Sequence, residues 1–394
     1  MGIPKVPHWT TIRQWALKMG LYEVTHKVHE KGKKWCALFD LTVDIGAIKC
    51  LLVLGIHMGK MQSAKDLTLS YSDVEVLGIF CTTKSNGNFI EQSLEQAEKA
   101  IGHPFAELLS DQGSDVVKGG TLYQEHSPKT VVIHDISHKM ANVLEKAFKN
   151  DPQWKSFCSQ LASTRLEVQQ TTDLSALMPP KLRTKARYMS VDVLMKWWRR
   201  FQDAKKTGTF QGIGEDRLEK YFGWMEGFMS CSQDWQMMIN IGEIIKEHVR
   251  KKGYSHSCYQ ELEQLINGIP TTSNRVIDFI TSVMDAVWEE VERLKPRQVV
   301  LGDGRIIESL FGKFKETAGN GVQGITIRVL TIATHLAKKD YKEIKMAMEK
   351  VSFKEVIIWG KDIAKDSLAS MRNKFFPHKK RNKNKGDHIE EMTA

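Results

Sequence analysis

The sequence predicts an α/β protein in which a mixed five-stranded sheet, flanked by helices, carries a large all-helical insertion. Short apolar or β-branched stretches follow one another from Trp35 to Ile133, as strands of a buried sheet do. From Ser137 to about Lys295 only helical periodicity remains. The 394 residues also exceed the roughly 250 to 300 that one hydrophobic core usually serves. We therefore expect one core interrupted by a second, helical unit.

The elements of the predicted core follow in order. Apolar residues spaced three and four apart predict a helix over 10–21, and a basic linker leads to the first strand. Three strands are expected at 36–40, 48–56 and 74–80, then a helix over 88–102. A strand at 106–109, a helix to about 123 and a strand at 130–133 complete the series. This order is typical of an RNase H-like core.

The remaining chain is expected to be helical, with helices at 191–205, 214–229, 235–251 and 272–294, another beginning near Gly304, and two or three more after it. The predicted units are an N-terminal helix and linker (1–34), the first part of the core (35–138), the helical insertion (139–300), helices completing the core (301–375), and a basic tail (376–394) expected to be disordered.

Composition favours a polyanionic partner, with nucleic acid first, because the formal net charge is +10 and the pI is about 9.1. The six cysteines include no C-x-x-C pair, which argues against a zinc knuckle or a disulfide scaffold. No signal peptide and no run of about 18 apolar residues is present. We expect a soluble cytoplasmic, nucleoid-associated protein with no membrane partner.

Three acidic residues are the candidates for catalysis. Asp40 directly follows the apolar run of the first strand, where a carboxylate is costly unless it is paired or metal-bound. An Asx turn before Thr42 is the plainer reading, and Asp44 is a local rival on the same side of an extended strand. Asp111 follows the fourth strand in a Ser-Asp-Gln-Gly turn, which alone is more typical of a structural turn than of a catalytic site.

The third acid, Glu308, lies on a helix whose core-facing stripe is Ile307, Leu310, Phe311 and Phe314. Glu308 instead shares a face with Arg305, Gly312 and Lys315. Such a face is equally typical of solvated ion pairs. Three convergent carboxylates would suit two-metal phosphoryl transfer, which requires hard oxygen ligands.

Taken together, the ordered motifs resemble bacterial insertion-sequence transposases with a D-D-E triad. The motifs are Asp40 to Gly46, Ser110 to Asp115, Ile133 to Lys139, Lys185 to Met189 and Glu308 to Lys313. The resemblance implies that Asp40, Asp111 and Glu308 are catalytic and bind two Mg²⁺ ions, with Mn²⁺ as the alternative. Their separations of 71 and 197 residues suit such enzymes. The resemblance also implies that the partner is double-stranded DNA (transposon ends and target) and that the chain forms a homodimer on DNA.

The resemblance extends to further residues and has two departures. Glu308 and Lys315 match an E-x6-K pattern in which the lysine contacts DNA phosphate, whereas Arg305 stands three rather than four residues before the glutamate. Asp135 and His138 are implied to lie beside the active site as supporting groups. Only 39 residues precede Asp40, fewer than the family's usual helix-turn-helix domain needs, so we expect a truncated form.

Other signals are weaker. His134 and His138 have the i, i+4 spacing of a zinc helix, but no third soft ligand is near. In the insertion, Lys185, Arg187, Arg199 and Arg200 alternate with aromatic residues, as a surface following DNA phosphates would. Trp197 and Trp198 are either core residues or a platform for an extruded base. The alternatives to a transposase are an RNase H-like nuclease and an inactive derivative that only binds DNA or a partner.

Overall fold

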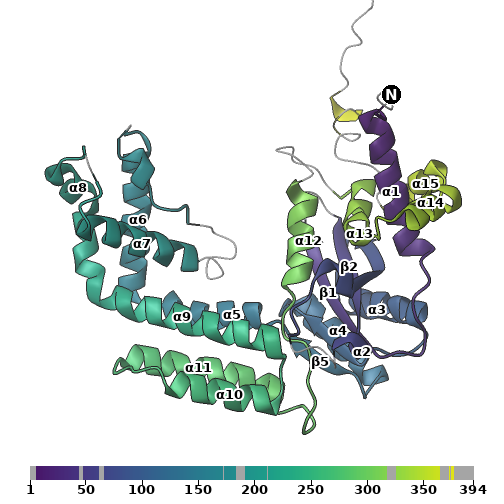
Figure 1. The fold of residues 1–394 in the computed structure, drawn as a ribbon, viewed down its shortest axis with the longest axis horizontal. Coiled ribbons are helices and arrows are strands. Elements are labelled where there is room, and N and C mark those ends of the chain that lie inside the picture. The colour runs from purple at the N-terminus through teal and green to yellow at the C-terminus, as the bar shows by residue number, and fades with distance from the viewer. Residues whose placement is uncertain are drawn as a thin grey trace, which may run out of the picture.

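The computed structural model describes residues 6–43, 48–61, 66–171, 173–182, 191–210, 212–316, 325–363, 372 and 374–376. Asp44, Lys185, Arg187 and most of the basic tail lie outside these residues. Within the described part, the chain forms a mixed five-stranded sheet and many helices (Figure 1).

The sheet has the strand order β3-β2-β1-β4-β5. Its first three strands, β1 (Trp35–Val43), β2 (Lys49–His57) and β3 (Val74–Thr82), are antiparallel neighbours. β4 (Glu107–Ser110) and β5 (Val131–His134) then run parallel to β1. The parallel connections are made by the helices α3 (Gly87–Ile101) and α4 (Ser114–His126). This topology is the one expected for an RNase H-like core.

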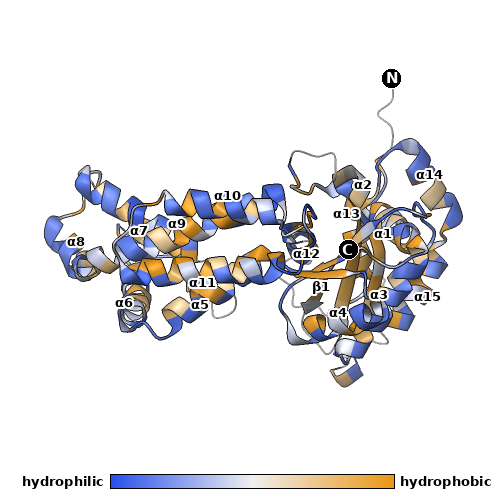
Figure 2. Ribbon diagram, turned by 90° about the horizontal axis from the view of Figure 1, so that it is seen from below, coloured by the Kyte–Doolittle hydropathy of each residue, from blue (hydrophilic) through white to orange (hydrophobic). Residues whose placement is uncertain are grey.

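Each face of the sheet has its own apolar core, because successive side chains of a strand point to opposite faces. Trp35, Ala37 and Phe39 of β1 pack in the core that α3 and α4 cover. Cys36 and Leu38 belong to the opposite core, which continues into the helices beyond β5 and into α12 (Arg305–Glu316). The strands are accordingly almost wholly hydrophobic in Figure 2. By the same alternation, Asp40 falls on the face that α12 covers.

The helices that follow β5 form an arm that extends away from the sheet (Figure 1). We call α5 to α11, residues 136–291, the helical arm; its helices are α5 (Ile136–Lys149), α6 (Pro152–Gln169), α7 (Val191–Lys206), α8 (Glu215–Phe222), α9 (Met229–Lys252), α10 (His256–Asn267) and α11 (Asn274–Val291). Buried aromatic rings hold its far half together, with Phe148 and Trp154 stacked at 4.5 Å between centroids. The predicted boundary after residue 138 falls inside α5.

A third, smaller core joins the two ends of the described chain. α1 (Trp9–Thr25) packs against α13 (Leu330–Leu336), α14 (Tyr341–Lys350) and α15 (Phe353–Ile363). Among the described residues, no helix combines the length and apolar character needed to span a membrane.

Several expected bounds differ in detail from the structure, including those of β1, α8 and α9. β1 does not end at Asp40 but continues to Val43, so Asp40 lies within a strand and not in an Asx turn. The helix expected over 214–229 ends at Phe222, and a 3-10 segment (Gly223–Phe228) leads into α9. Glycines at 223 and 227 lower the helix propensity of this stretch.

Candidate functional site

Asp40, Asp111 and Glu308 line one small pocket beside the interior strands β1 and β4 of the sheet. β1 brings Asp40, the end of β4 brings Asp111, and α12 brings Glu308. β1 and β4 are parallel neighbours, with Phe39 opposite Ser110, which places the two aspartates side by side at the same end of the sheet. The rest of the lining consists of Leu38, Phe39, Ser110, Asp135, His138, Gly304 and Ile307. Residues far apart in the sequence therefore meet here.

Asp40 is strongly perturbed in this pocket. Burial raises its pKa, the nearby charge of Asp111 adds to the rise, and the hydrogen bond from the Leu41 N–H opposes it. The net result is a pKa of about 7. A carboxylate whose ionised form is disfavoured by burial and by a second carboxylate is stabilised when a cation binds beside it.

Asp111 is held by the turn that precedes α4. Its Oδ1 accepts a hydrogen bond from the Gly113 N–H at 3.1 Å. A Cβ at residue 113 would lie 3.2 Å from that same oxygen, so glycine suits the close approach. Asp111 therefore belongs to a structural turn and also lines the pocket. The turn holds its carboxylate beside Asp40.

Glu308 is paired with His138. The His138 Nε2 lies 2.9 Å from the Glu308 Oε1, and both side chains are only partly exposed. Burial lowers the pKa of His138, but the hydrogen bond to Glu308 and the charge of Asp135 outweigh it and raise the pKa to about 9. A protonated His138 therefore donates to Glu308 at neutral pH and neutralises part of the acidic cluster.

Asp135 ties the pocket to the start of α12. Its side chain caps α5 by accepting from the His138 N–H at 3.0 Å and also accepts from the Gly304 N–H. Burial raises the pKa of Asp135 to about 6, against the lowering effect of His138. Gly304 allows this close contact, since a Cβ there would lie 3.1 Å from the Asp135 Oδ2. Both residues expected to support the site thus contact it.

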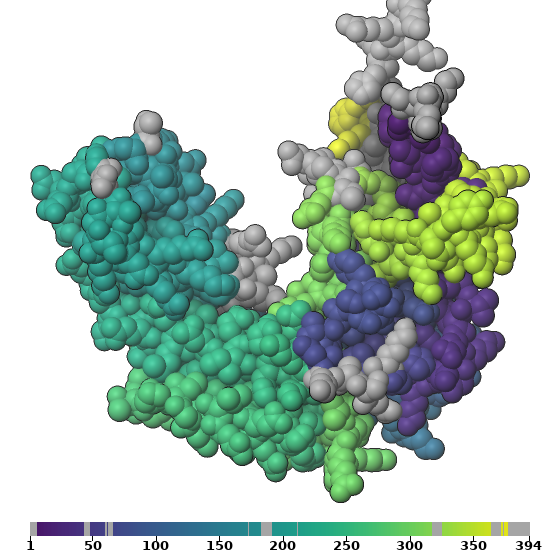
Figure 3. Space-filling model, viewed as in Figure 1, coloured from purple at the N-terminus to yellow at the C-terminus, as the bar shows by residue number. Residues whose placement is uncertain are grey.

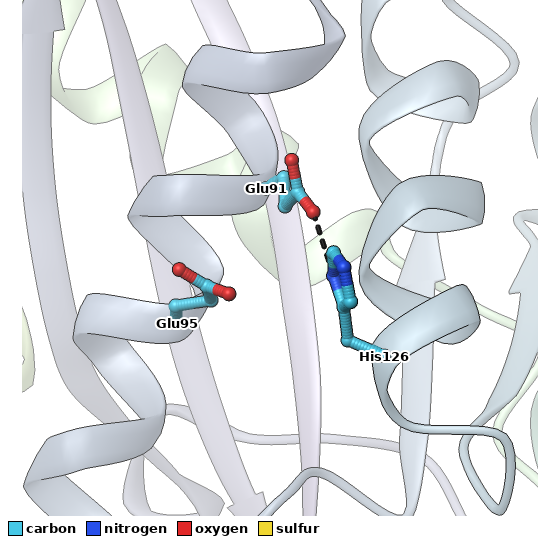
Figure 4. Close-up of side chains that lie close together, drawn as sticks. All are labelled: Glu91, Glu95 and His126. Carbon is cyan, nitrogen blue, oxygen red and sulfur yellow. Dashed lines mark ion pairs between the residues drawn. The ribbon is translucent and has the colours of Figure 1, made fainter.

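The carboxylates have the chemistry for a divalent metal, since hard oxygen donors suit Mg²⁺ and Mn²⁺. With Glu308 bonded to His138, the three acids do not all lie within 4.8 Å of one another, whereas Glu91, Glu95 and His126 form the one such group among the described residues. That group joins α3 to α4 at the surface (Figure 4). It contains the Glu91–His126 pair at 2.9 Å, and no sequence signal indicated it.

The residues expected to contact DNA lie on different parts of the molecule. Lys315 is exposed near the end of α12, and Arg199 and Arg200 are exposed on α7. Arg305 is held by Asp303 at 2.9 Å and by Glu247 at 2.9 Å, so its guanidinium already has protein partners. The DNA role of these four stays a prediction, as does that of Lys185 and Arg187, which lie outside the described residues.

The two tryptophans of α7 are core residues here. Trp198 is 1% exposed and packs edge-on against Phe157. Trp197 is partly buried and donates to the Leu177 carbonyl. Neither histidine of the suspected zinc pair has another histidine or cysteine as its partner, since His134 pairs with Glu290 and His138 with Glu308.

Comparisons with known proteins add little to this geometry. No family profile matches the chain, and no curated protein sequence matches it. Among solved structures, a chain described as the Drosophila P element transposase strand transfer complex is similar over 86% of this chain and 87% of its own length. The TM-score is 0.36 and the sequence identity is 13%.

Proposed function

We propose that the chain is the catalytic region of a DNA transposase that performs metal-dependent DNA strand cleavage and strand transfer. The observation that carries the proposal is that Asp40, Asp111 and Glu308, from β1, β4 and α12, line one pocket on an RNase H-like sheet.

The three carboxylates would hold two Mg²⁺ ions. When bound, such ions activate the attacking oxygen and stabilise the leaving oxygen of a phosphodiester in an in-line displacement. The protein's own groups prepare the site for them. Asp40 has to lose its proton, while His138 holds Glu308 and offsets its charge until a cation replaces it.

Double-stranded DNA is the proposed substrate, and the shape of the molecule offers a place for it. Figure 3 shows a hollow between the far end of the helical arm and the half of the molecule that contains the sheet. α12 stands on the sheet side of this hollow in Figure 1 and between arm and sheet in Figure 2. DNA in the hollow would reach α12 and its Lys315, and α7 would supply Arg199 and Arg200 from the arm.

We further infer, from the family resemblance, that two chains assemble on DNA. Association with the nucleoid follows from the same DNA binding. Light scattering of the complex with DNA from the flanks of the gene tests this inference, because a mass of two chains is expected and a single chain per DNA would contradict it.

The test of the catalytic proposal uses supercoiled plasmid and DNA from both flanks of the gene, with Mg²⁺ or Mn²⁺. Glu308→Gln should abolish strand cleavage while DNA binding and the circular dichroism spectrum stay unchanged. Glu316→Gln, an exposed glutamate on the same helix, is the matched control and should cut normally. Cutting by the Glu308 variant would refute the assignment, whereas cutting without joining of 3′ ends by the wild-type chain would favour the nuclease.

A further inference from the structure

An ion cluster centred on the fully buried Glu290 connects the helical arm to the sheet. Glu290 of α11 has a side-chain exposure of 0%. Its Oε1 lies 3.0 Å from the His134 Nδ1 and 2.8 Å from the Lys139 Nζ, and its Oε2 accepts from the His134 N–H at 3.3 Å. Arg293 lies 3.9 Å away at the edge of the cluster. Removing one member of a buried charge pair is strongly destabilising, so these contacts hold α11 firmly against the end of β5.

The electrostatics of the cluster favour an ionised Glu290. Burial would raise its pKa, but the hydrogen bond from His134 and the charge of Lys139 lower it below the usual value. Lys139 is itself only 3% exposed and also donates to the Ala286 carbonyl at 2.9 Å. Glu290 and Lys139 therefore form a buried ion pair, and not a pair of solvated surface groups.

The six residues 134–139 are held from two sides. On one side, His134 and Lys139 contact Glu290 of the helical arm. On the other side, Asp135 and His138, which lie between them in the sequence, contact α12 and the residue directly before it. Asp135 accepts from the Gly304 N–H, immediately before α12, and His138 bonds to Glu308 on α12. If α11 shifted residues 134–139, the contacts that Asp135 and His138 make at the acidic pocket would shift with them.

We propose that Glu290 is a positioning residue for the acidic pocket, acting through Asp135 and His138 on α12 and Glu308. The inference deepens the proposed function and rests on it. It makes the helical arm part of the metal site, although none of the described residues of the arm beyond α5 lines the pocket. Groups that orient metal ligands typically contribute about 10- to 100-fold to metal affinity.

The test compares Glu290→Gln with Glu289→Gln in the full chain. Glu289 pairs with the same lysine at 2.8 Å but is 63% exposed, and no contact to His134 is found for it among the described residues, which makes it a matched control. The readout is the dissociation constant for Mn²⁺ alone, measured by electron paramagnetic resonance without DNA. We expect about tenfold weaker binding for Glu290→Gln and an unchanged constant for Glu289→Gln.

A second variant covers the case in which the single substitution does not fold. Replacing Lys139 and Glu290 together by methionine removes both buried charges, a change that proteins often tolerate. His134 still loses its acceptor, so weaker Mn²⁺ binding is expected again. Wild-type-like Mn²⁺ binding by either folded variant would overturn the positioning role and leave the proposed function intact. A wild-type chain that binds no Mn²⁺ would instead overturn the proposed function.

Discussion

The His138 imidazole and the Glu308 carboxylate meet at 2.9 Å across 170 residues of chain. One group starts the helical arm and the other lies on the helix that follows it. In the absence of a cation, this pair offsets the negative charge that Asp40, Asp111 and Glu308 bring together.

Replacing His138 by alanine should therefore destabilise the metal-free protein. Hydrogen bonds to charged groups contribute about 1.5 to 3 kcal/mol, so a decrease of about 2 kcal/mol in the free energy of unfolding is expected in EDTA. Added Mg²⁺ should restore most of the lost stability. Urea unfolding at pH 7 measures both values, and Lys196→Ala, which removes a surface pair with Asp192 on α7, is the control. Equal decreases with and without Mg²⁺ would contradict this role.

Asp111→Asn should make the metal-free protein more stable and inactive at once. Burial raises the pKa of Asp40 and the charge of Asp111 raises it further, so removing that charge relieves repulsion at pH 8. Thermal melting in EDTA should shift upward, while plasmid nicking with Mg²⁺ is abolished. A lower melting temperature would show that the Asp111 carboxylate has a stabilising partner in the free protein.

Glu107 should make the stability of the fold depend on pH. This glutamate is fully buried at the start of β4, where burial raises its pKa from 4.5 to about 8, against hydrogen bonds from Cys36 and the Leu301 N–H. A carboxyl whose pKa is higher in the folded chain contributes stability below about pH 4.5, which is lost as the pH rises through about 8.

Glu107→Gln keeps an acceptor for the Leu301 N–H but cannot ionise. Its contribution should therefore not change between pH 5 and pH 8, and the variant should be more stable than the wild type at pH 8. Urea midpoints across this range test the prediction. Parallel curves for the two proteins would mean that folding does not raise the pKa of Glu107.

Lys315→Ala should weaken DNA binding and reduce its salt dependence. Neutralising one phosphate fewer makes the slope of log K against log salt concentration shallower by about 0.9 for duplex DNA. Fluorescence anisotropy at several NaCl concentrations measures the slope. Lys342, an exposed lysine on α14, provides the control substitution. If both variants keep the wild-type slope, Lys315 does not bind phosphate.

The sheet could be predicted from the sequence because its strands are short, apolar and buried on both faces, so their pattern is strong. Asp40 and Asp111 are recognisable for a related reason, since a charged residue directly after a buried apolar run is unusual. The predicted strand ends too early at Asp40, because an aspartate is typical of a turn, although Leu41-Thr42-Val43 after it has the apolar and β-branched residues of a strand.

The partners of the acids could not be predicted. Glu290 lies on a helix whose sequence contains several other acids, and only the packing of α11 against α5 shows that this one is buried beside His134. Arg305 appeared available for DNA from its helical face, but Asp303 and Glu247 reach it in the folded chain. Contacts between distant segments depend on how the helices pack against one another. The hydrophobic periodicity of a sequence carries no information about that packing.

The chain leaves the sheet at Ile136 and returns at Gly302, where the Ile136 N–H donates to the Gly302 carbonyl at 2.9 Å. The two segments that connect the helical arm to the sheet therefore contact each other, and we call this place the neck. When two points of a chain are already in contact, lengthening the segment between them adds little to the entropic cost of closing it. The added free energy is only about 0.6 kcal/mol for each doubling of the segment length. Arms of very different length could consequently be grafted at this neck without changing the register of the sheet.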